Sequence, residues 1–226
     1  MELAIDTSTD IAGVAVSDSG VIIAENTWRC VKNHTVELVP VINNLIKQSG
    51  SDYSQIKGVV VARGPGAYNG LRVGISTAKG IALALKVPVV GISTLEIEAY
   101  PFAFTGLMVC PIHDAGRDEI AVAMFLSQKG ALVRHWDERL ERIESLCRLI
   151  TERTVFCGEL TPDTIKTIIS RLGELALFPP DSVRLRRPAC LVEIGWKRLS
   201  RGEADTPASL QPLYLRAPHI TQSKKK

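Results

Sequence analysis

The sequence predicts an α/β fold built from two repeat-related units in tandem. Three observations support this prediction. Short apolar runs alternate with helix-like segments along all 226 residues. The segment 6–28 aligns without gaps on the segment 114–136. A stretch with Pro, Gly and aromatic residues, 100–106, separates the two halves. Strands that alternate with helices imply mostly parallel sheets, to which the opening strands of each unit add an antiparallel edge.

The first half begins with short apolar runs joined by polar turns, and then alternates helices with strands. The expected elements are strands at 2–6, 11–17 and 21–28, a helix at 35–49, a strand at 56–62, a helix at 70–85, a strand at 87–92 and a short helix from Ser93.

The second half repeats this order. After the aligned segment, the expected elements are a helix at 137–152, a strand at 154–159, a helix at 161–173, a strand at 175–178 and a helix at 187–200. The identical residues of the aligned segments include the pairs Asp6 with Asp114, Asp10 with Asp118, Val14 with Val122, Ala15 with Ala123 and Trp28 with Trp136.

Two such βββαβαβα units in tandem are the plan of the actin, hexokinase and Hsp70-like fold, also described as ribonuclease H-like. We therefore expect a first domain at 1–100, which carries the partner-binding helices, and a repeat-related second domain at 105–216. Whether the last helix of this second unit packs back on the first domain stays open. The basic segment 217–226 is expected to be a solvated tail.

Composition narrows the class of protein. The net charge of +3 neither requires nor excludes nucleic acid as a partner. Five widely separated cysteines without a C-x-x-C pair are typical of a reduced, cytoplasmic chain. The N-terminal segment carries charges at Glu2 and Asp6, so we expect no signal peptide. No apolar run approaches the ~20 residues that span a bilayer, so we expect no membrane association.

The stretch GPGAYNG, residues 64–70, follows an expected strand and precedes an expected helix, where backbone N–H groups can hold an anion. It nevertheless lacks the Lys of the G-x-x-x-x-G-K-[ST] loop. Its glycines are spaced G-x-G-x-x-x-G, which also differs from the dinucleotide fingerprint G-x-G-x-x-G. A phosphate-binding loop is therefore not expected here.

Small residues recur every four positions along the helix that follows, at Gly70, Gly74, Ala78 and Ala82. They form a stripe without side-chain bulk that lets another backbone come close. Each helical glycine costs roughly 1 kcal/mol relative to alanine, so a contact should compensate. The stripe packs either on the chain's own sheet or on another protein. The wide apolar arc of the helix at 35–49 favours another protein.

Four segments resemble the bacterial TsaB (YeaZ) family: MELAIDTST, GPGAYNGLRVGIS, GISTLEIEA and HDAGRDEIAVAMF. The resemblance covers nearly the whole chain and is densest before residue 126. Members usually carry Ser, Phe and Thr where this chain has Ala67, Tyr68 and Asn69. These proteins are non-catalytic members of the glycoprotease-like branch of the actin-like fold.

The resemblance implies a scaffold subunit in the synthesis of threonylcarbamoyladenosine next to the anticodon of tRNA. It implies a TsaD-type catalytic subunit, a TsaE-type ATPase in the same complex and tRNA as the substrate of that complex. Whether the chain forms a homodimer through the same helices when the partner is absent stays open. The partner contacts that it implies on the two helices of the first domain are His34, Leu38, Ile42, Leu45, Gly70, Arg72, Gly74 and Ala78.

No catalytic residue, metal or cofactor is expected. The catalytic relative holds its metal with an H-x-x-x-H pair, whereas here His34 is followed four residues later by Leu38. His113 lies three residues after Cys110, a spacing that could bind metal, but no second pair accompanies it.

An alternative function rests on the loop Asp6, Thr7 and Ser8, with Asp114 as the repeat mate of Asp6. Relatives of this fold contact the phosphates of a magnesium nucleotide there. The loop is interpreted as vestigial, or else as part of an ATP-dependent kinase or transferase that uses Asp6 and Asp114. An aspartate at a strand end often only caps a turn. Six late basic residues are interpreted as a solvated surface rather than as a tRNA-binding patch, namely Arg184, Arg186, Arg187, Lys197, Arg198 and Arg201.

Overall fold

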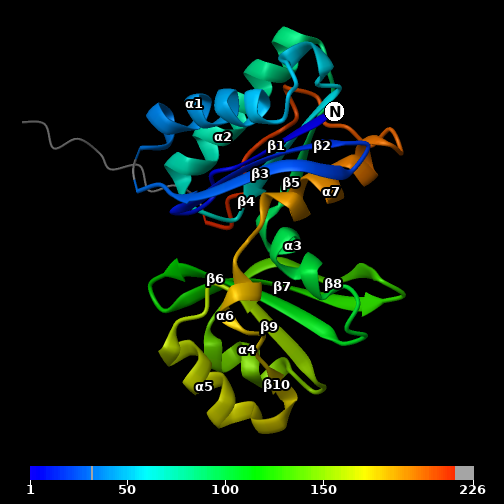
Figure 1. Ribbon diagram of the computed structural model, residues 1–226. Coiled ribbons are helices and arrows are strands. Elements are labelled where there is room, and N and C mark those ends of the chain that lie inside the picture. The colour runs from blue at the N-terminus through cyan, green and yellow to red at the C-terminus, as the bar shows by residue number, and fades with distance from the viewer. Residues whose placement is uncertain (32, 217–226) are drawn as a thin grey trace, which may run out of the picture.

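The computed structural model describes residues 1–31 and 33–216, and these residues form two domains that each contain a five-stranded sheet (Figure 1). The strands of the first sheet are β1 (Glu2–Asp6), β2 (Ile11–Asp18), β3 (Val21–Arg29), β4 (Gly58–Gly64) and β5 (Val89–Ser93). The strands of the second sheet are β6 (Met108–Gly116), β7 (Glu119–Gln128), β8 (Ala131–Glu141), β9 (Thr154–Gly158) and β10 (Ala176–Leu177).

The helices of the described residues are α1 (His34–Gln48), α2 (Tyr68–Leu85), α3 (Thr94–Ala99), α4 (Ile143–Leu149), α5 (Pro162–Leu172), α6 (Asp181–Arg184) and α7 (Pro188–Leu199). Short 3₁₀ turns lie at η1 (Tyr53–Gln55), η2 (Tyr100–Phe102) and η3 (Gly173–Leu175). Within the described ranges, none of these helices has both the length and the apolar character needed to cross a membrane.

The two sheets share one plan. The spatial order is β3-β2-β1-β4-β5 in the first sheet and β8-β7-β6-β9-β10 in the second. In each sheet the first three strands form an antiparallel meander, and the last two join in parallel. This symmetry confirms the predicted α/β architecture of two repeat-related units.

The central strands of the first sheet are apolar on both faces because helices cover both faces. Leu3 and Ile5 of β1 point into a core shared with α1 and α2, whereas Ala4 points into a core shared with α7. The alternation follows from the period of two along a strand. Figure 1 shows α1 and α2 together on one side of this sheet and α7 on the other.

The last helix packs on the first domain, which is the arrangement that the sequence had left open. A Cβ built on Gly195 of α7 would lie 2.3 Å from Cγ1 of Val60, so the helix backbone rests directly on β4. The chain then continues along the same domain. Leu210 is buried in the first core, and the N–H of Leu213 donates to the carbonyl of Arg63 at 2.7 Å. The predicted tail, 217–226, lies outside the described residues.

The prediction of a helix at 137–152 is wrong for the first third of that segment. Residues up to Glu141 continue strand β8, and helix α4 is confined to Ile143–Leu149. Glu141 lies opposite Ile120 on β7, and the ladder runs on to Ala131 opposite Gln128. Hydrogen bonds to β7 thus outweigh the helical preference of a segment rich in Glu and Arg.

Candidate functional site

The stripe of small residues on α2 faces the chain's own strand β1. A Cβ on Gly70 would lie 2.1 Å from the carbonyl oxygen of Thr7, and a Cβ on Gly74 would lie 2.3 Å from Oγ1 of the same threonine. The same Oγ1 donates to the carbonyl of Gly70 at 2.7 Å, and Ala78 is fully buried. The stripe therefore serves close packing within the domain. Gly70, Gly74 and Ala78, which were expected to meet another protein, are thus buried within the free chain.

The expected contacts on α1 are buried as well. Leu38, Ile42 and Leu45 belong to the core between the helices and the first sheet. His34 is buried, and its Nε2 lies 3.1 Å from the carbonyl oxygen of Thr9, which ties the start of α1 to the loop after β1. Of the eight expected partner contacts, all of them among the described residues, Arg72 alone is exposed.

Other side chains form the outer surface of these two helices. Val36 of α1 is 72% exposed, and Leu83 of α2 is 62% exposed. Tyr68, at the start of α2, stacks on Tyr214 with ring centroids 5.1 Å apart. Arg72 lies over the Tyr68 ring and donates to its hydroxyl at 2.8 Å. This outer surface carries apolar, aromatic and cationic groups that stay exposed in the described chain, although Tyr214 covers part of the Tyr68 ring.

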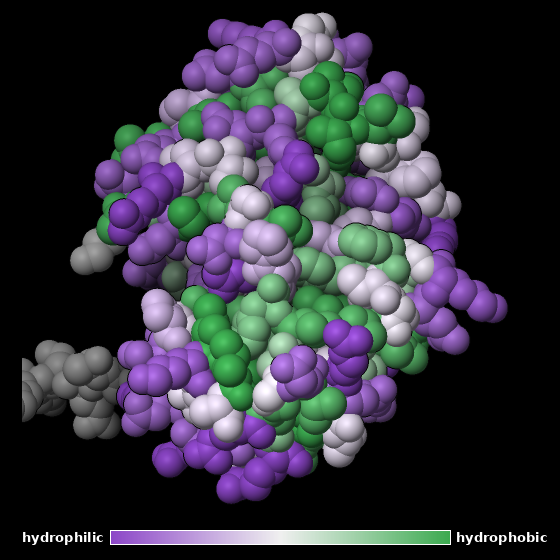
Figure 2. All heavy atoms as spheres, turned by 60° about the horizontal axis from the view of Figure 1, so that its bottom comes forward, coloured by the Kyte–Doolittle hydropathy of each residue, from purple (hydrophilic) through white to green (hydrophobic). Residues whose placement is uncertain are grey.

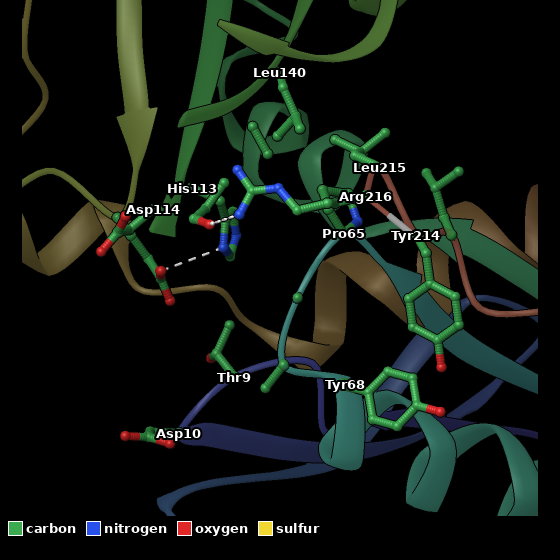
Figure 3. A pocket seen from close by; sticks show the side chains of 16 residues that line it. Thr9, Asp10, Pro65, Tyr68, His113, Asp114, Leu140, Tyr214, Leu215 and Arg216 are labelled. Carbon is green, nitrogen blue, oxygen red and sulfur yellow. Dashed lines mark hydrogen bonds and ion pairs between the residues drawn. The ribbon is translucent and has the colours of Figure 1, made fainter. Parts of the chain in front are cut away.

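A cavity of about 840 Å³ lies between the two domains. Figure 3 shows the paired rings of Tyr68 and Tyr214 at one end of this cavity and His113 and Asp114 at the other. It is lined by Thr9, Asp10, Pro65, Gly66, Ala67, Tyr68, His113, Asp114, Ala115, Ala121, Leu140, Glu159, Leu213, Tyr214, Leu215 and Arg216.

Asp6 lies buried at the end of β1, beside this cavity, and both of its oxygens accept hydrogen bonds. Oδ1 accepts from the backbone N–H of Ser8 at 2.9 Å and from its hydroxyl at 2.6 Å. Oδ2 accepts from Nε of Arg186 at 2.5 Å. The same guanidinium donates to Oε1 of Glu98 at 3.0 Å and to Oγ1 of Thr9 at 2.8 Å.

His113 joins this buried group of charges. Its Nε2 lies 2.7 Å from Oε1 of Glu98, and its Nδ1 lies 3.3 Å from Oε2 of Glu159. Burial alone lowers the pKa of His113, but the charge of Glu98 and the hydrogen bonds to both carboxylates outweigh burial and raise it to about 9. His113 is therefore protonated at neutral pH.

The contacts of Cys110 and His113, whose spacing in the sequence could bind a metal, do not form a metal site. Both ring nitrogens of His113 face carboxylates, and Cys110 is fully buried, which raises the pKa of its thiol. In the part of the chain that the structure describes, no group of three His, Cys, Asp or Glu side chains is arranged to hold a metal ion.

The repeat mates Asp6 and Asp114 have different environments. Asp114 is exposed at the cavity, and its Oδ1 accepts from the N–H of Gly116 at 2.8 Å, so it caps a turn. Thr7 and Ser8 are buried, and their hydroxyls bond within the chain. The loop expected to be vestigial is thus engaged by the chain's own groups.

Sequence reasoning missed Glu98 and Glu159, and it grouped Arg186 with surface cations. A signal existed for Glu98, because a carboxylate inside the apolar segment GISTLEIEA is rarely buried without a partner. Five of the six late basic residues contact carboxylates of the chain itself. These contacts are Arg184 with Asp181, Arg186 with Asp6 and Glu98, Arg187 with Glu25, Lys197 with Glu193, and Arg198 with Glu96.

Comparisons with known proteins place the chain in a family. A family model described as TsaD, tRNA N6-adenosine threonylcarbamoyltransferase, matches residues 28–219. The tRNA threonylcarbamoyladenosine biosynthesis protein TsaB of Bacillus subtilis (strain 168) is 29% identical over 218 residues, which are 95% of this chain and 93% of that protein. TsaB of Escherichia coli (strain K12) is 37% identical over 97 residues, which are 43% of this chain and 42% of that protein.

Solved structures agree with this placement. YeaZ from Pseudomonas aeruginosa has a TM-score of 0.78 and 25% identity, and the match covers 95% of this chain and 99% of that one. The ethanolamine utilization protein EutJ of Carboxydothermus hydrogenoformans, at a TM-score of 0.53 and 12% identity, shares the fold alone. Because the family model matches most of the chain and the Bacillus and Pseudomonas relatives match nearly all of it, this chain belongs to the TsaB (YeaZ) proteins of the TsaD family.

Proposed function

We propose that this protein is the non-catalytic subunit that binds and activates a TsaD-type transferase in the synthesis of threonylcarbamoyladenosine in tRNA. The TsaB names of its relatives support this pathway, and the TsaD family model supports a shared ancestry with the transferase. A TsaE-type ATPase is the proposed third component, and tRNA is the proposed substrate of the complex, which acts in the cytoplasm.

The observation that carries this proposal is the uncovered outer surface of α1 and α2 (Figure 1). Val36 and Val39 of α1 and Leu83 of α2 expose large apolar side chains there, and Tyr68 and Arg72 of α2 are exposed as well. Burying such a side chain in a complex stabilises it by roughly 1.5–3 kcal/mol. We therefore propose these five residues as partner contacts, in place of the buried residues expected earlier. The same surface is proposed to form a homodimer when the partner is absent.

The cavity supports a non-catalytic role. The carboxylate of Asp6 already accepts from Arg186 and Ser8, and His113 is protonated between two carboxylates. Neither group is free to act as a general base at neutral pH. The comparisons with TsaB and YeaZ likewise do not favour the kinase alternative.

Calorimetric titration of the TsaD-type subunit from the same cell tests the surface. We expect Val36→Asp and Leu83→Asp to weaken binding at least ~10-fold, a loss of about 1.4 kcal/mol, because each buries an unpaired carboxylate in the complex. Their melting temperatures should stay at the value of the unchanged protein, because both side chains face solvent in the free chain.

A matched control lies on the second domain. Figure 2, with this end of the molecule turned forward, shows apolar side chains there too, and Ile169 of α5 is 50% exposed. Ile169→Asp makes the same change at similar exposure but far from α1 and α2, so the affinity should not change. Equal affinity for all four proteins would remove this surface from the proposal.

Reconstitution tests the role itself. Mixtures of the TsaD-type and TsaE-type subunits with tRNA and the threonylcarbamoyl donor should form the modified adenosine only when this protein is added. The protein alone should form none and should not hydrolyse ATP. ATP turnover by the isolated chain that disappears in Asp6→Asn would instead establish the kinase alternative.

A further inference from the structure

We propose that Arg186 acts as an internal cation at the end of β1 that locks the two domains in one arrangement and keeps a magnesium-bound nucleotide out of the cleft between them. The inference concerns the interior of the chain and does not depend on which partner binds α1 and α2.

Arg186 lies at the centre of a network of five ionisable side chains, each from a different segment of the chain. Asp6 ends β1 in the first domain, and Glu98 lies on α3, between the two sheets. His113 on β6 and Glu159 after β9 belong to the second domain, and Arg186 lies where the chain passes from α6 back to α7. Because the bonds run from Asp6 through Arg186 and Glu98 to His113 and Glu159, the network connects both domains directly.

The end of β1 has the features of a cation site. It is the carboxyl end of a strand that pairs in parallel with β4, and ligands of such sheets bind beyond the carboxyl ends of their strands. A carboxylate with neighbouring hydroxyls, here Asp6 with Thr7 and Ser8, supplies the oxygen ligands that magnesium prefers.

These residues nevertheless do not fit a bound metal. Oδ2 of Asp6 accepts from Arg186, Oδ1 accepts twice from Ser8, and the hydroxyl of Thr7 donates to Gly70. The guanidinium of Arg186 is only 5% exposed and permanently charged, so a divalent ion beside Asp6 would meet a fixed positive charge at close range. Arg186 therefore occupies the place that a metal ion would need.

Glu98 links the ion pairs of the two domains into one continuous network. Its Oε1 alone accepts from Arg186 and lies against His113, while its buried Oε2 has no hydrogen-bond partner among the described residues. A Cβ on Gly158 would lie 2.7 Å from Oε2, so the second domain packs tightly against this carboxylate. Without Arg186, the buried carboxylates of Asp6 and Glu98 would lose their shared counter-charge, a strongly destabilising change.

Neighbouring arginines provide a matched test. Arg186→Met removes the buried guanidinium, whereas Arg187→Met removes one that is 59% exposed and paired with Glu25. In the full chain, we expect Arg186→Met to shift the folding equilibrium toward the unfolded state at least ~100-fold and to enlarge the radius of gyration in small-angle X-ray scattering. Arg187→Met should change neither quantity measurably. Calorimetric titration with magnesium ATP should show no binding to the unchanged protein.

Two further variants keep the test decisive if Arg186→Met does not fold. Asp6→Asn combined with Arg186→Met removes both charges of one pair, so it should recover part of the lost stability while the enlarged radius of gyration persists. Glu98→Gln keeps the volume but removes the bridging charge, so it should enlarge the radius as well. The lock is refuted if these two variants keep the unchanged radius of gyration, or if the unchanged protein binds magnesium ATP through Asp6.

Discussion

Nε2 of His113 lies 2.7 Å from Oε1 of Glu98, and this contact joins the second domain to the helix between the two sheets. Both side chains are almost fully buried, and Glu98 also accepts from Arg186. An imidazolium held between Glu98 and Glu159 stabilises the folded chain only while it is protonated, so stability should depend on pH.

The direction of this dependence follows from the raised pKa of His113, about 9 in the folded chain against about 6.5 in an unfolded one. Between these values the folded state binds more protons, so the free energy of unfolding should fall as pH rises. The contribution of His113 is complete below about pH 6.5 and is lost through pH 9. Urea unfolding measured from pH 6 to 9.5 checks this expectation.

Two histidine variants test whether His113 causes this pH dependence of stability. His113→Gln should flatten the decline between pH 6.5 and 9, because Glu98, Glu159, Arg186 and Asp6 around it then face no titrating imidazole. His135→Gln, at an exposed position, should leave the decline intact. An identical pH profile in all three proteins would contradict the protonated state of His113.

One substitution at two glycines of α2 should have opposite effects. Gly74→Ala places a methyl group where the nearest atom, Oγ1 of Thr7, is 2.3 Å away, so it should destabilise the fold by ~1–3 kcal/mol. Gly80→Ala meets no atom of residues 1–31 or 33–216 within 4 Å and should stabilise the helix by about 0.4–1 kcal/mol. Melting temperatures of the two variants check this, and a stabilised Gly74→Ala would show that the stripe is not packed on β1.

Truncation at two nearby positions of α1 should separate its buried face from its exposed one. Leu38 is 1% exposed in the first core, so Leu38→Ala should cost about 2–5 kcal/mol of unfolding free energy. Val36→Ala should change it by no more than about 0.5 kcal/mol, because that side chain lies in solvent. Denaturant unfolding of both variants measures the difference, and equal losses would contradict the assigned faces.

The placement of α7 predicts a specific sensitivity at Gly195. Gly195→Ala would bring a Cβ to 2.3 Å from Val60 of β4, so the helix must shift and the fold should lose ~1–3 kcal/mol. Hydrogen exchange should then speed up in β4 and β1 of the first sheet and stay unchanged in β9. Faster exchange in β9 instead would place α7 on the second domain.

The sequence by itself determined the alternation of strands and helices, the doubling of the unit and the family. These features follow from local periodicity and from motifs that each lie within one short segment. It also showed that α2 carries a bulk-free stripe, because residues four apart share one face of a helix.

Only the tertiary structure decided which other parts of the chain each helix face and each strand contacts. The same stripe could contact a strand of its own domain or another protein, and the hydrogen bond from Thr7 to Gly70 exists only once β1 and α2 pack together. Glu141 becomes part of a strand because β7 offers it a ladder.

Arg186 and Arg187 are identical neighbours in sequence, yet one is buried in the cleft and the other is exposed beside Glu25. The cost of burying a charge is offset only where carboxylates from distant segments converge, here Asp6 and Glu98. That convergence depends on contacts 180 and 88 residues apart along the chain, which no local pattern encodes.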